Sequence, residues 1–210
     1  PKKPLLAILG GAKISSKLNL LFTLVGCVDY LIVGGGIANT FLKCKGIEVG
    51  KSIHEKELTK TACEILELAS SKNVQMPLPT DVIVAESPKS LKTVRLTKVE
   101  NIKKKEMILD FGPQTLDSLK ALVKKSNTII WNGPLGLFEI DEFSGGTNEI
   151  AKEIGLSKAF SVIGGGDTIS AINKFNVKGD IDYISTGGGA FLEFLKDRNL
   201  PAINALMGRD

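Results

Sequence analysis

The sequence predicts an α/β fold: a doubly wound, Rossmann-like, mostly parallel sheet in three layers, with helices on both faces. Short apolar runs rich in β-branched residues alternate along the chain with longer helical patterns, as in α/β proteins. The runs are apolar almost throughout, which is typical of parallel strands covered on both faces. Glycine clusters follow four of the runs, at 10–11, 34–36, 164–166 and 187–189, and ligands bind beyond the carboxyl ends of such strands.

Taken in order, the apolar runs predict strands at 5–9, 30–33, 82–85, 107–110, 128–131, 160–163 and 183–185. Helices are expected at 13–25, 37–43, 55–72, 113–125, 144–154, 168–174 and 190–195. The pattern within 55–72 places its apolar residues on one face, and Pro113 suits the first turn of its helix. The polar and basic segment 91–105 is expected to be a hairpin or excursion, and 76–81 a loop that leads into a strand.

Composition is that of an ordinary soluble domain, with 43% hydrophobic and 24% charged residues among 210. Lysines are spread along the chain and the net charge is +4, so we expect no nucleic-acid partner, although a slight positive excess suits an anionic ligand. We find no signal peptide and no apolar stretch of about 18 residues, and expect no membrane span. No linker divides the chain, so one domain covers 1–210. The abrupt start at Pro1 favours a fragment or a processed chain.

The cysteines and the histidine exclude several kinds of site. Cys27, Cys44 and Cys63 have no C-x-x-C spacing, so we expect reduced thiols and a cytoplasmic protein. His54 is the only histidine, which excludes a metal site or a catalytic triad built on several histidines. Its side chain is expected either to face solvent or to pack against neighbouring residues.

Two familiar nucleotide motifs are absent. The segment GIEVGKS at 46–52 resembles a P-loop, but it has three residues between its glycines where the motif needs four. It also follows a helical pattern rather than a strand. The chain has no G-x-G-x-x-G sequence, so the dinucleotide fingerprint of a nicotinamide-dependent dehydrogenase is missing.

The turn after the first strand carries two lysines. Lys13 follows the double glycine and Lys17 lies four residues later, on the same face of the expected helix. Two ammonium groups stacked there would repel each other without an anion. Lysines at this spacing are also common on surfaces, but the neighbouring glycine turns favour an anion site.

Two further motifs allow both a structural and a functional interpretation. Asp167, in the GGGDT segment at 164–168, is either a helix N-cap or a ligand of nucleotide-bound Mg²⁺. The segment WNGPLGLFE at 131–139 is either a tight loop with an aromatic anchor or a pocket for a base and a ribose. In the second interpretation Leu135 and Leu137 face the ring and Glu139 accepts from sugar hydroxyls.

Together these motifs resemble the phosphoglycerate kinase family. The blocks GGAKISSK (10–17), GGGIANTF (34–41), DFGPQT (110–115), WNGPLGLFE (131–139), GGGDT (164–168) and STGGGAFLE (185–193) occur in the family's order and at about its spacing. The resemblance covers essentially all 210 residues and is to the C-terminal, nucleotide-binding half of a two-domain enzyme. It implies reversible phosphoryl transfer between 1,3-bisphosphoglycerate and ADP, giving 3-phosphoglycerate and ATP, in a monomeric glycolytic kinase.

The resemblance also implies roles for single residues. Lys13 resembles the lysine that meets the transferred phosphoryl group, Lys17 the one that holds the nucleotide phosphates, and Asp167 the Mg²⁺ ligand. The helix-start donors to the phosphates are expected at Gly165, Gly166, Thr168, Gly188 and Gly189, of which Gly165 and Gly188 join the lysines as catalytic groups. Further nucleotide contacts are expected at Gly11, Gly34, Gly35, Ile53, Gly112, Asn132, Pro134, Leu135, Leu137, Glu139 and Gly164. Cofactors are therefore Mg²⁺ and ATP or ADP as co-substrate.

Two residues depart from the family pattern: Ser16 replaces an acid, and Phe191 a smaller residue. The family's first half supplies the acid-substrate pocket with a catalytic arginine, and none of Arg95, Arg198 and Arg209 lies in a matching motif. We therefore expect the N-terminal domain to be absent, turnover to be slow or nil, and residues 200–210 to be loose. A non-catalytic nucleotide sensor remains an alternative, and purine preference stays open.

Overall fold

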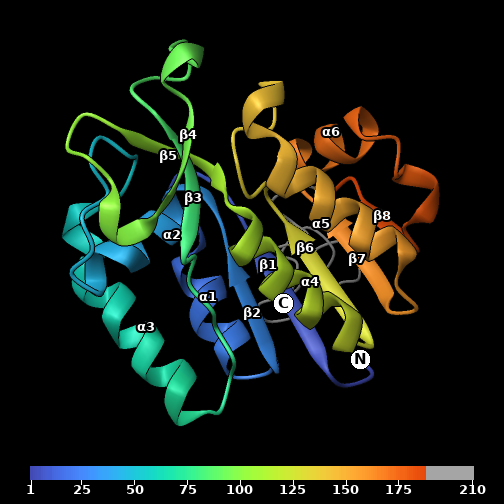
Figure 1. Cartoon of the computed structure of the whole chain (residues 1–210). Helices are drawn as coiled ribbons and strands as arrows, with labels where there is room; N and C mark the ends of the chain where they lie inside the picture. Colours follow the sequence, from blue (N-terminus) through green and yellow to red (C-terminus); the bar gives the residue numbers. More distant parts are fainter. Residues whose placement is uncertain (188–210) are drawn as a thin grey trace.

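A five-stranded parallel sheet forms the centre of the computed structural model, which describes residues 1–187. Its strands are β1 (Leu5–Leu9), β2 (Tyr30–Val33), β6 (Thr128–Asn132), β7 (Phe160–Gly164) and β8 (Tyr183–Ser185). They lie in the order β2-β1-β6-β7-β8, and each neighbouring pair is parallel (Figure 1). The chain moves from β1 outward to β2 and later continues on the other side of β1, which confirms the doubly wound α/β prediction.

Helices connect and cover these strands. The described residues form α1 (Leu18–Val25), α2 (Gly35–Cys44), α3 (Thr59–Ser71), α4 (Pro113–Lys125), α5 (Gly145–Leu156) and α6 (Gly166–Lys174). Figure 1 shows α1, α2 and α3 grouped on the β2 side of the molecule, and α5 and α6 on the side of β7 and β8. The helix expected at 190–195 lies outside the described residues.

Two predicted helices begin later than expected. The segment predicted at 13–25 starts as a 3₁₀ turn, Ser15–Lys17, and becomes α-helical only at α1. The segment predicted at 55–72 likewise starts with a 3₁₀ turn, Lys56–Leu58, before α3. No side chain caps the N-terminus of either helix, and a tighter 3₁₀ turn is a common way to begin a helix under such conditions.

Two of the predicted strands belong to a separate antiparallel sheet. β3 (Asp81–Ala85) lies between β4 (Arg95–Lys98) and β5 (Met107–Phe111), and both pairs are antiparallel. The expectation of parallel strands at 82–85 and 107–110 is therefore wrong, because an apolar run reports burial and not the direction of the neighbouring strand. For segment 91–105 the sequence predicts a hairpin or an excursion. The segment contributes one strand, β4, whose partner β3 lies before it in the sequence, so it is half of a β3–β4 hairpin rather than a hairpin of its own.

A buried tryptophan at the end of β6 anchors the turn that follows this strand. Trp131 is 0% exposed, and its Nε1 donates to the carbonyl oxygen of Gly133 at 2.8 Å. Buried indole N–H groups usually have such a partner, and this one fixes the carbonyl of a residue only two positions along the chain. A tight loop with an aromatic anchor is therefore present at 131–139, which confirms the structural interpretation without excluding the pocket for a base and a ribose.

Two of the three cysteines are joined. Cys44, at the end of α2, and Cys63, in α3, form a disulfide with Cα atoms 5.5 Å apart, while Cys27 is free. The expectation of reduced thiols is wrong for this pair. It rested on spacing along the sequence, whereas the pairing follows from the packing of α2 against α3, which spacing alone does not reveal.

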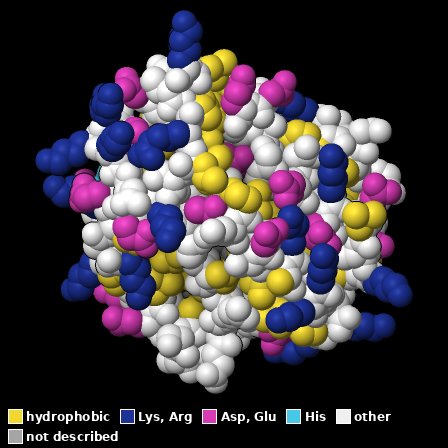
Figure 2. Space-filling model, viewed as in Figure 1, with side chains coloured by type: hydrophobic (Ala, Val, Ile, Leu, Met, Phe, Trp, Pro, Cys, Tyr) yellow, Lys and Arg dark blue, Asp and Glu magenta, His cyan; other side chains and the backbone are white. Residues whose placement is uncertain are grey.

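The surface is mixed in charge. Figure 2 shows Lys and Arg side chains interspersed with Asp and Glu over the face in view. Within residues 1–187, no helix is both long and apolar enough to traverse a bilayer.

The start of α2 lies directly against the turn that follows β1. A Cβ atom on Gly36 would overlap the carbonyl oxygen of Ala12, and the amide of Ile37 donates to the carbonyl oxygen of Gly11 at 3.2 Å. The glycine at position 36 is therefore required for backbone-to-backbone packing.

We expect the substitution Gly36→Ala to lower the free energy of unfolding by about 1–3 kcal/mol, because the added methyl group must displace backbone rather than a flexible side chain. Gly179→Ala is the matched control, since a Cβ atom there would meet nothing within 4 Å. Urea unfolding of both variants measures the difference. Equal stability of the two variants would contradict the packing argument.

Candidate functional site

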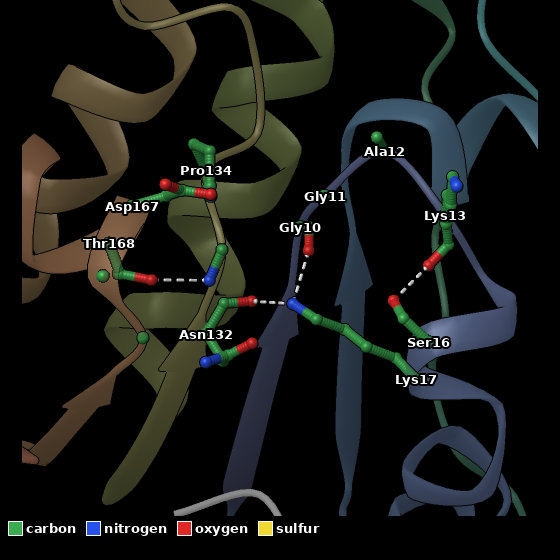
Figure 3. A pocket seen from close by; sticks show the side chains of 13 residues that line it. Gly10, Gly11, Ala12, Lys13, Ser16, Lys17, Asn132, Pro134, Asp167 and Thr168 are labelled. Atoms are coloured by element: carbon green, nitrogen blue, oxygen red, sulfur yellow. Dashed lines mark hydrogen bonds between the residues drawn. The ribbon is translucent and has the colours of Figure 1, made fainter. Parts of the chain in front are cut away.

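A cavity lies where the strand order of the parallel sheet reverses. It has a volume of about 440 Å³ and is bounded by the turns after β1 and β6 and by the start of α6 (Figure 3). In open α/β sheets ligands bind at this reversal, outside the carboxyl ends of the strands. The cavity is lined by nine of the predicted site residues: Gly11, Lys13, Lys17, Asn132, Pro134, Gly165, Gly166, Asp167 and Thr168.

Lys17 crosses from its 3₁₀ turn to the edge of the sheet. Its Nζ donates to the carbonyl oxygens of Gly10, at 2.6 Å, and of Asn132, at 3.1 Å. Burial lowers the pKa of Lys17 to about 8, and the negative charge of Asp167 partly offsets this lowering. The ammonium group is thus held at the ends of β1 and β6, in a setting where an added anion would be favourable.

Lys13 is exposed and its side chain extends in a different direction from that of Lys17 (Figure 3). The prediction that the two ammonium groups stack on one helical face is therefore wrong, because Lys13 precedes the 3₁₀ turn and lies outside the helix. The carbonyl oxygen of Lys13 accepts from Ser16 Oγ at 2.8 Å. Both lysines nevertheless line the same cavity.

The loop that carries the two lysines is tied to the segment before α3. Both carboxylate oxygens of Glu55 accept from Ser15, one from its amide at 2.8 Å and one from its Oγ at 2.6 Å. The amide of Glu55 in turn donates to Thr40 Oγ1, on α2, at 3.1 Å. Sequence reasoning missed this tether, since no spacing rule connects residues 40 positions apart.

The N-terminus of α6 opens onto the same cavity. Gly165 precedes the helix with a φ of 99°, a conformation that favours glycine. The amides of Gly166, Asp167 and Thr168 then have no partner within the helix, as at any helix start, and a Cβ atom on Gly166 would meet nothing within 4 Å. Such donors, together with the positive end of a helix dipole, are the arrangement that suits an anion.

Asp167 is not a helix N-cap. It lies within the first turn of α6, and no side chain makes a capping hydrogen bond to this helix. The structural interpretation of Asp167 is therefore wrong, which leaves its exposed carboxylate facing the cavity. Among the described residues, no group of three or more His, Cys, Asp or Glu side chains could hold a metal ion.

Two buried polar side chains lock the turns beneath the cavity. Thr168 Oγ1 accepts from the amide of Gly133 at 2.6 Å and donates to the carbonyl oxygen of Gly164 at 3.0 Å. Asn132 Nδ2 donates to the same carbonyl oxygen at 2.7 Å. Both side chains therefore hold the backbone of the turns that border the cavity. Because the Thr168 hydroxyl is already bonded, its backbone amide is the group that is left to contact a ligand.

A second, more apolar cavity of about 270 Å³ adjoins the first and shares Gly11, Ala12, Pro134 and Asp167 with it. It brings together five further predicted residues: Gly35, Ile53, Leu135, Leu137 and Glu139. Ile53 is 60% exposed, and its carbonyl oxygen accepts from Asn39 Nδ2 at 3.0 Å. The arrangement suits a flat apolar group whose polar tail enters the first cavity.

Three predicted residues lie beside the cavities without lining either. Gly34 packs against Leu135, and Gly112, which precedes α4, packs against the carboxylate of Asp81. Gly164 is buried at the end of β7. Gly34 and Gly112 therefore serve close packing. Gly188 and Gly189 lie outside the described residues, as do Phe191, Arg198, Arg209 and segment 200–210.

Sequence reasoning also missed that Asp110 is a buried carboxyl group at the border of the second cavity. Its Oδ2 accepts from the amide of Gly146 at 2.7 Å, while its buried Oδ1 has no partner among the described residues. Burial raises the pKa of Asp110 to about 7. A carboxylate within an apolar strand is the signal that could have identified it, because such groups are rarely buried.

Comparison with known proteins shows the family of the chain. The chain matches the family model described as phosphoglycerate kinase over residues 1–198. It is 51% identical over 209 residues to the phosphoglycerate kinase of Legionella pneumophila (strain Paris), covering 100% of this chain and 53% of that one. For the phosphoglycerate kinase of Francisella tularensis subsp. novicida (strain U112), identity is 50% over 206 residues, with 98% and 53% covered.

Solved structures show the same fold. Phosphoglycerate kinase from Coxiella burnetii superposes with a TM-score of 0.95 at 47% identity, covering 100% of this chain and 53% of that chain. Phosphoglycerate kinase from Pyrococcus horikoshii OT3 superposes with a TM-score of 0.82 at 32% identity, with 98% and 52% covered. The chain thus spans about half the length of the relatives it matches.

We expect the Nζ of Lys17 to titrate near pH 8 in the ligand-free chain, followed by NMR of isotope-labelled lysines and assigned with Lys17→Met. Because the folded pKa lies below the ordinary value of 10.5, the unfolded chain binds more protons between these pH values. Stability should therefore rise with pH across that window, and this slope should be smaller in Lys17→Met.

Asp167→Asn should lower the pKa of Lys17 further, since the carboxylate charge opposes the effect of burial. An ordinary lysine titration in both the wild-type chain and Asp167→Asn would show that the Lys17 ammonium is not buried as described.

Proposed function

Because this chain belongs to the phosphoglycerate kinase family, we propose that it is the nucleotide-binding half of such an enzyme, binding MgADP and MgATP. The reaction is reversible phosphoryl transfer between 1,3-bisphosphoglycerate and ADP in glycolysis. A β-phosphate oxygen of ADP forms a bond to the phosphorus of the acyl phosphate, whose bond to the carboxylate oxygen breaks, leaving 3-phosphoglycerate and ATP. We further propose a monomeric, cytoplasmic chain.

The observation that carries this proposal is that Lys17 and the first amides of α6 face one cavity. The ammonium group lies on one side and the helix N-terminus on the other, so the polyphosphate meets positive charge from both. Phosphoryl transfer requires alignment and charge stabilisation more than covalent participation by the protein. Lys13, which is exposed at the rim, is free to follow the migrating phosphoryl group.

The base and ribose are assigned to the second cavity. Ile53, Leu135 and Leu137 provide apolar surface for a purine ring, and the exposed carboxylate of Glu139 is the acceptor for ribose hydroxyls. The two cavities adjoin at Gly11, Ala12 and Pro134. A nucleotide that spans them places its base against the apolar wall and its phosphates at the helix start.

Asp167 fits the role of a magnesium ligand. Its carboxylate is exposed on the first cavity and accepts no hydrogen bond from the described residues. Mg²⁺ is commonly held by one or two carboxylates together with substrate phosphates and water, so a single aspartate at this position is sufficient. When bound, the ion neutralises charge on the phosphates. The chain itself positions Asp167, which lies on a helix whose first turn is fixed by the hydrogen bonds of Thr168.

The acid substrate is proposed to bind to the other half of the enzyme. Arg95 is the one arginine among residues 1–187, and it lines neither cavity. Its Nε and Nη2 donate to both carboxylate oxygens of Glu106, at 2.9 and 2.7 Å. An arginine in such a bidentate pair is not available to an anionic substrate.

Calorimetric titration tests nucleotide binding. We expect ADP to bind the chain, and saturating Mg²⁺ to tighten binding by about tenfold. Asp167→Asn should remove most of this magnesium effect while retaining ADP binding in its absence. Glu142→Gln, which alters an exposed acid outside both cavities, is the control and should keep the full effect. No binding of ADP at millimolar concentration would overturn the proposed function.

The isolated chain should turn over the acid substrate at least about 100-fold more slowly than a full-length relative, because the second reactant is not positioned. A coupled assay at saturating ATP and 3-phosphoglycerate, with the Coxiella burnetii enzyme as the positive control, measures the ratio. Equal activity per site would show that the chain alone holds both substrates.

A further inference from the structure

Lys174, in the last turn of α6, holds the loop that follows Leu137. Its Nζ donates to the carbonyl oxygens of Phe138, at 3.0 Å, and Glu139, at 3.4 Å, and to Asp141 Oδ1 at 2.6 Å. An ammonium group has three donors, and here each has an acceptor in one four-residue stretch. The contacts join two segments more than 30 positions apart in the sequence.

The three contacts differ in what they contribute. The side chain of Asp141 is 87% exposed and that of Lys174 is 33% exposed, and ion pairs between exposed groups contribute little. The two carbonyl contacts fix the backbone itself. Among the described residues, Lys174 is the only donor to these two carbonyl oxygens.

The direction of the Glu139 side chain depends on this backbone. Glu139 is exposed, lines the second cavity, and its carboxylate makes no hydrogen bond or ion pair with the described residues. The loop is fixed before it by the bond from the Leu137 amide to the Leu109 carbonyl oxygen at 2.8 Å and by the buried side chain of Phe138. Beyond Phe138, the Ile140 amide donates to the Leu137 carbonyl oxygen at 3.1 Å and closes a turn. Within this turn, Lys174 holds the outward carbonyl oxygens of Phe138 and Glu139.

We propose that Lys174 is a positioning residue for sugar recognition: it orients Glu139 toward the ribose hydroxyls and so sets the preference for ribonucleotides over deoxyribonucleotides. This inference rests on the proposed function, in which Glu139 is the ribose acceptor.

Helix α6 connects the two recognition sites physically. Its first turn carries the amides and Asp167 that face the phosphates, and its last turn carries Lys174. A nine-residue helix spans about 12 Å from its first to its last residue. Displacement of the helix therefore moves the phosphate donors and the Glu139 loop together, so their separation stays constant.

Binding of ADP, 2′-deoxy-ADP and 3′-deoxy-ADP to the full chain tests the proposal by calorimetry. The wild-type chain should prefer ADP over at least one deoxy analogue by about tenfold, the expected value for a hydrogen bond to a charged acceptor. Glu139→Gln should reduce this preference. Lys174→Met should reduce it to the same extent, and the double variant should show no further loss, since both changes act on one contact.

Asp141→Asn is the matched control, because it weakens the exposed ion pair while leaving both carbonyl contacts. It should retain the preference for ADP. If Lys174→Met does not fold, Lys174→Gln replaces it, and its shorter amide should give a preference below that of the wild-type chain. Loss of affinity for all three ligands by one common factor would indicate a merely structural role and would overturn the proposal.

Failure of the proposed function and failure of the Lys174 role give different experimental results. No binding of ADP to the wild-type chain overturns the proposed function and this inference with it. An unchanged preference in Glu139→Gln overturns the assignment of Glu139 as the ribose acceptor. If Glu139→Gln loses the preference and the Lys174 variant retains it, the positioning role of Lys174 alone is wrong.

Discussion

Direct backbone contact between neighbouring turns determines the shape of the candidate site. The amide of Gly10 donates to Asn132 at 2.9 Å, that of Gly35 to Leu135 at 3.0 Å, and that of Ile37 to Gly11 at 3.2 Å, each to a carbonyl oxygen. These bonds join the turns after β1, β2 and β6 without any side chain between them. The chain can reach this arrangement only with glycine at positions such as Gly36, where a Cβ atom would overlap a neighbouring carbonyl.

This contact also determines which donors remain for a ligand. At the start of α2, the amides of Gly35 and Ile37 are already bonded to carbonyl oxygens of other turns. At the start of α6, the first amides face the cavity. Glycine runs that look equivalent in the sequence therefore have different roles, because one packs against protein and the other borders open space. The donors that border the cavity are therefore the first amides of α6 and the ammonium of Lys17, rather than a uniform ring of amides.

The sequence predicted those features that depend on local pattern. β1, β2, β8 and α4 have the predicted bounds, since burial periodicity and Pro113 are local signals. The direction of β3 and β5, the late start of α1 and the Cys44–Cys63 pair were not predictable in this way, because each depends on a neighbour distant in sequence. The same limit applies to the site. Motifs identified the residues around both cavities. The different directions of the Lys13 and Lys17 side chains, however, follow from a 3₁₀ turn that the motif does not reveal. The contacts of Glu55 and Lys174 have no sequence signal, because they join segments far apart in the chain.

Burial separates the side chains that are open to the cavities from those that fix their positions. Lys13, Asp167, Ile53 and Glu139 are exposed, whereas Trp131, Asn132 and Thr168 are buried beneath them. Exposed charges keep their hydration until a ligand replaces it, so they carry little desolvation penalty in the folded chain. Their backbones must then be ordered by other groups, because an exposed side chain cannot anchor itself. Buried hydrogen bonds from Trp131 and Thr168 supply that order at the phosphate end, and Lys174 is the corresponding group at the end that carries Glu139.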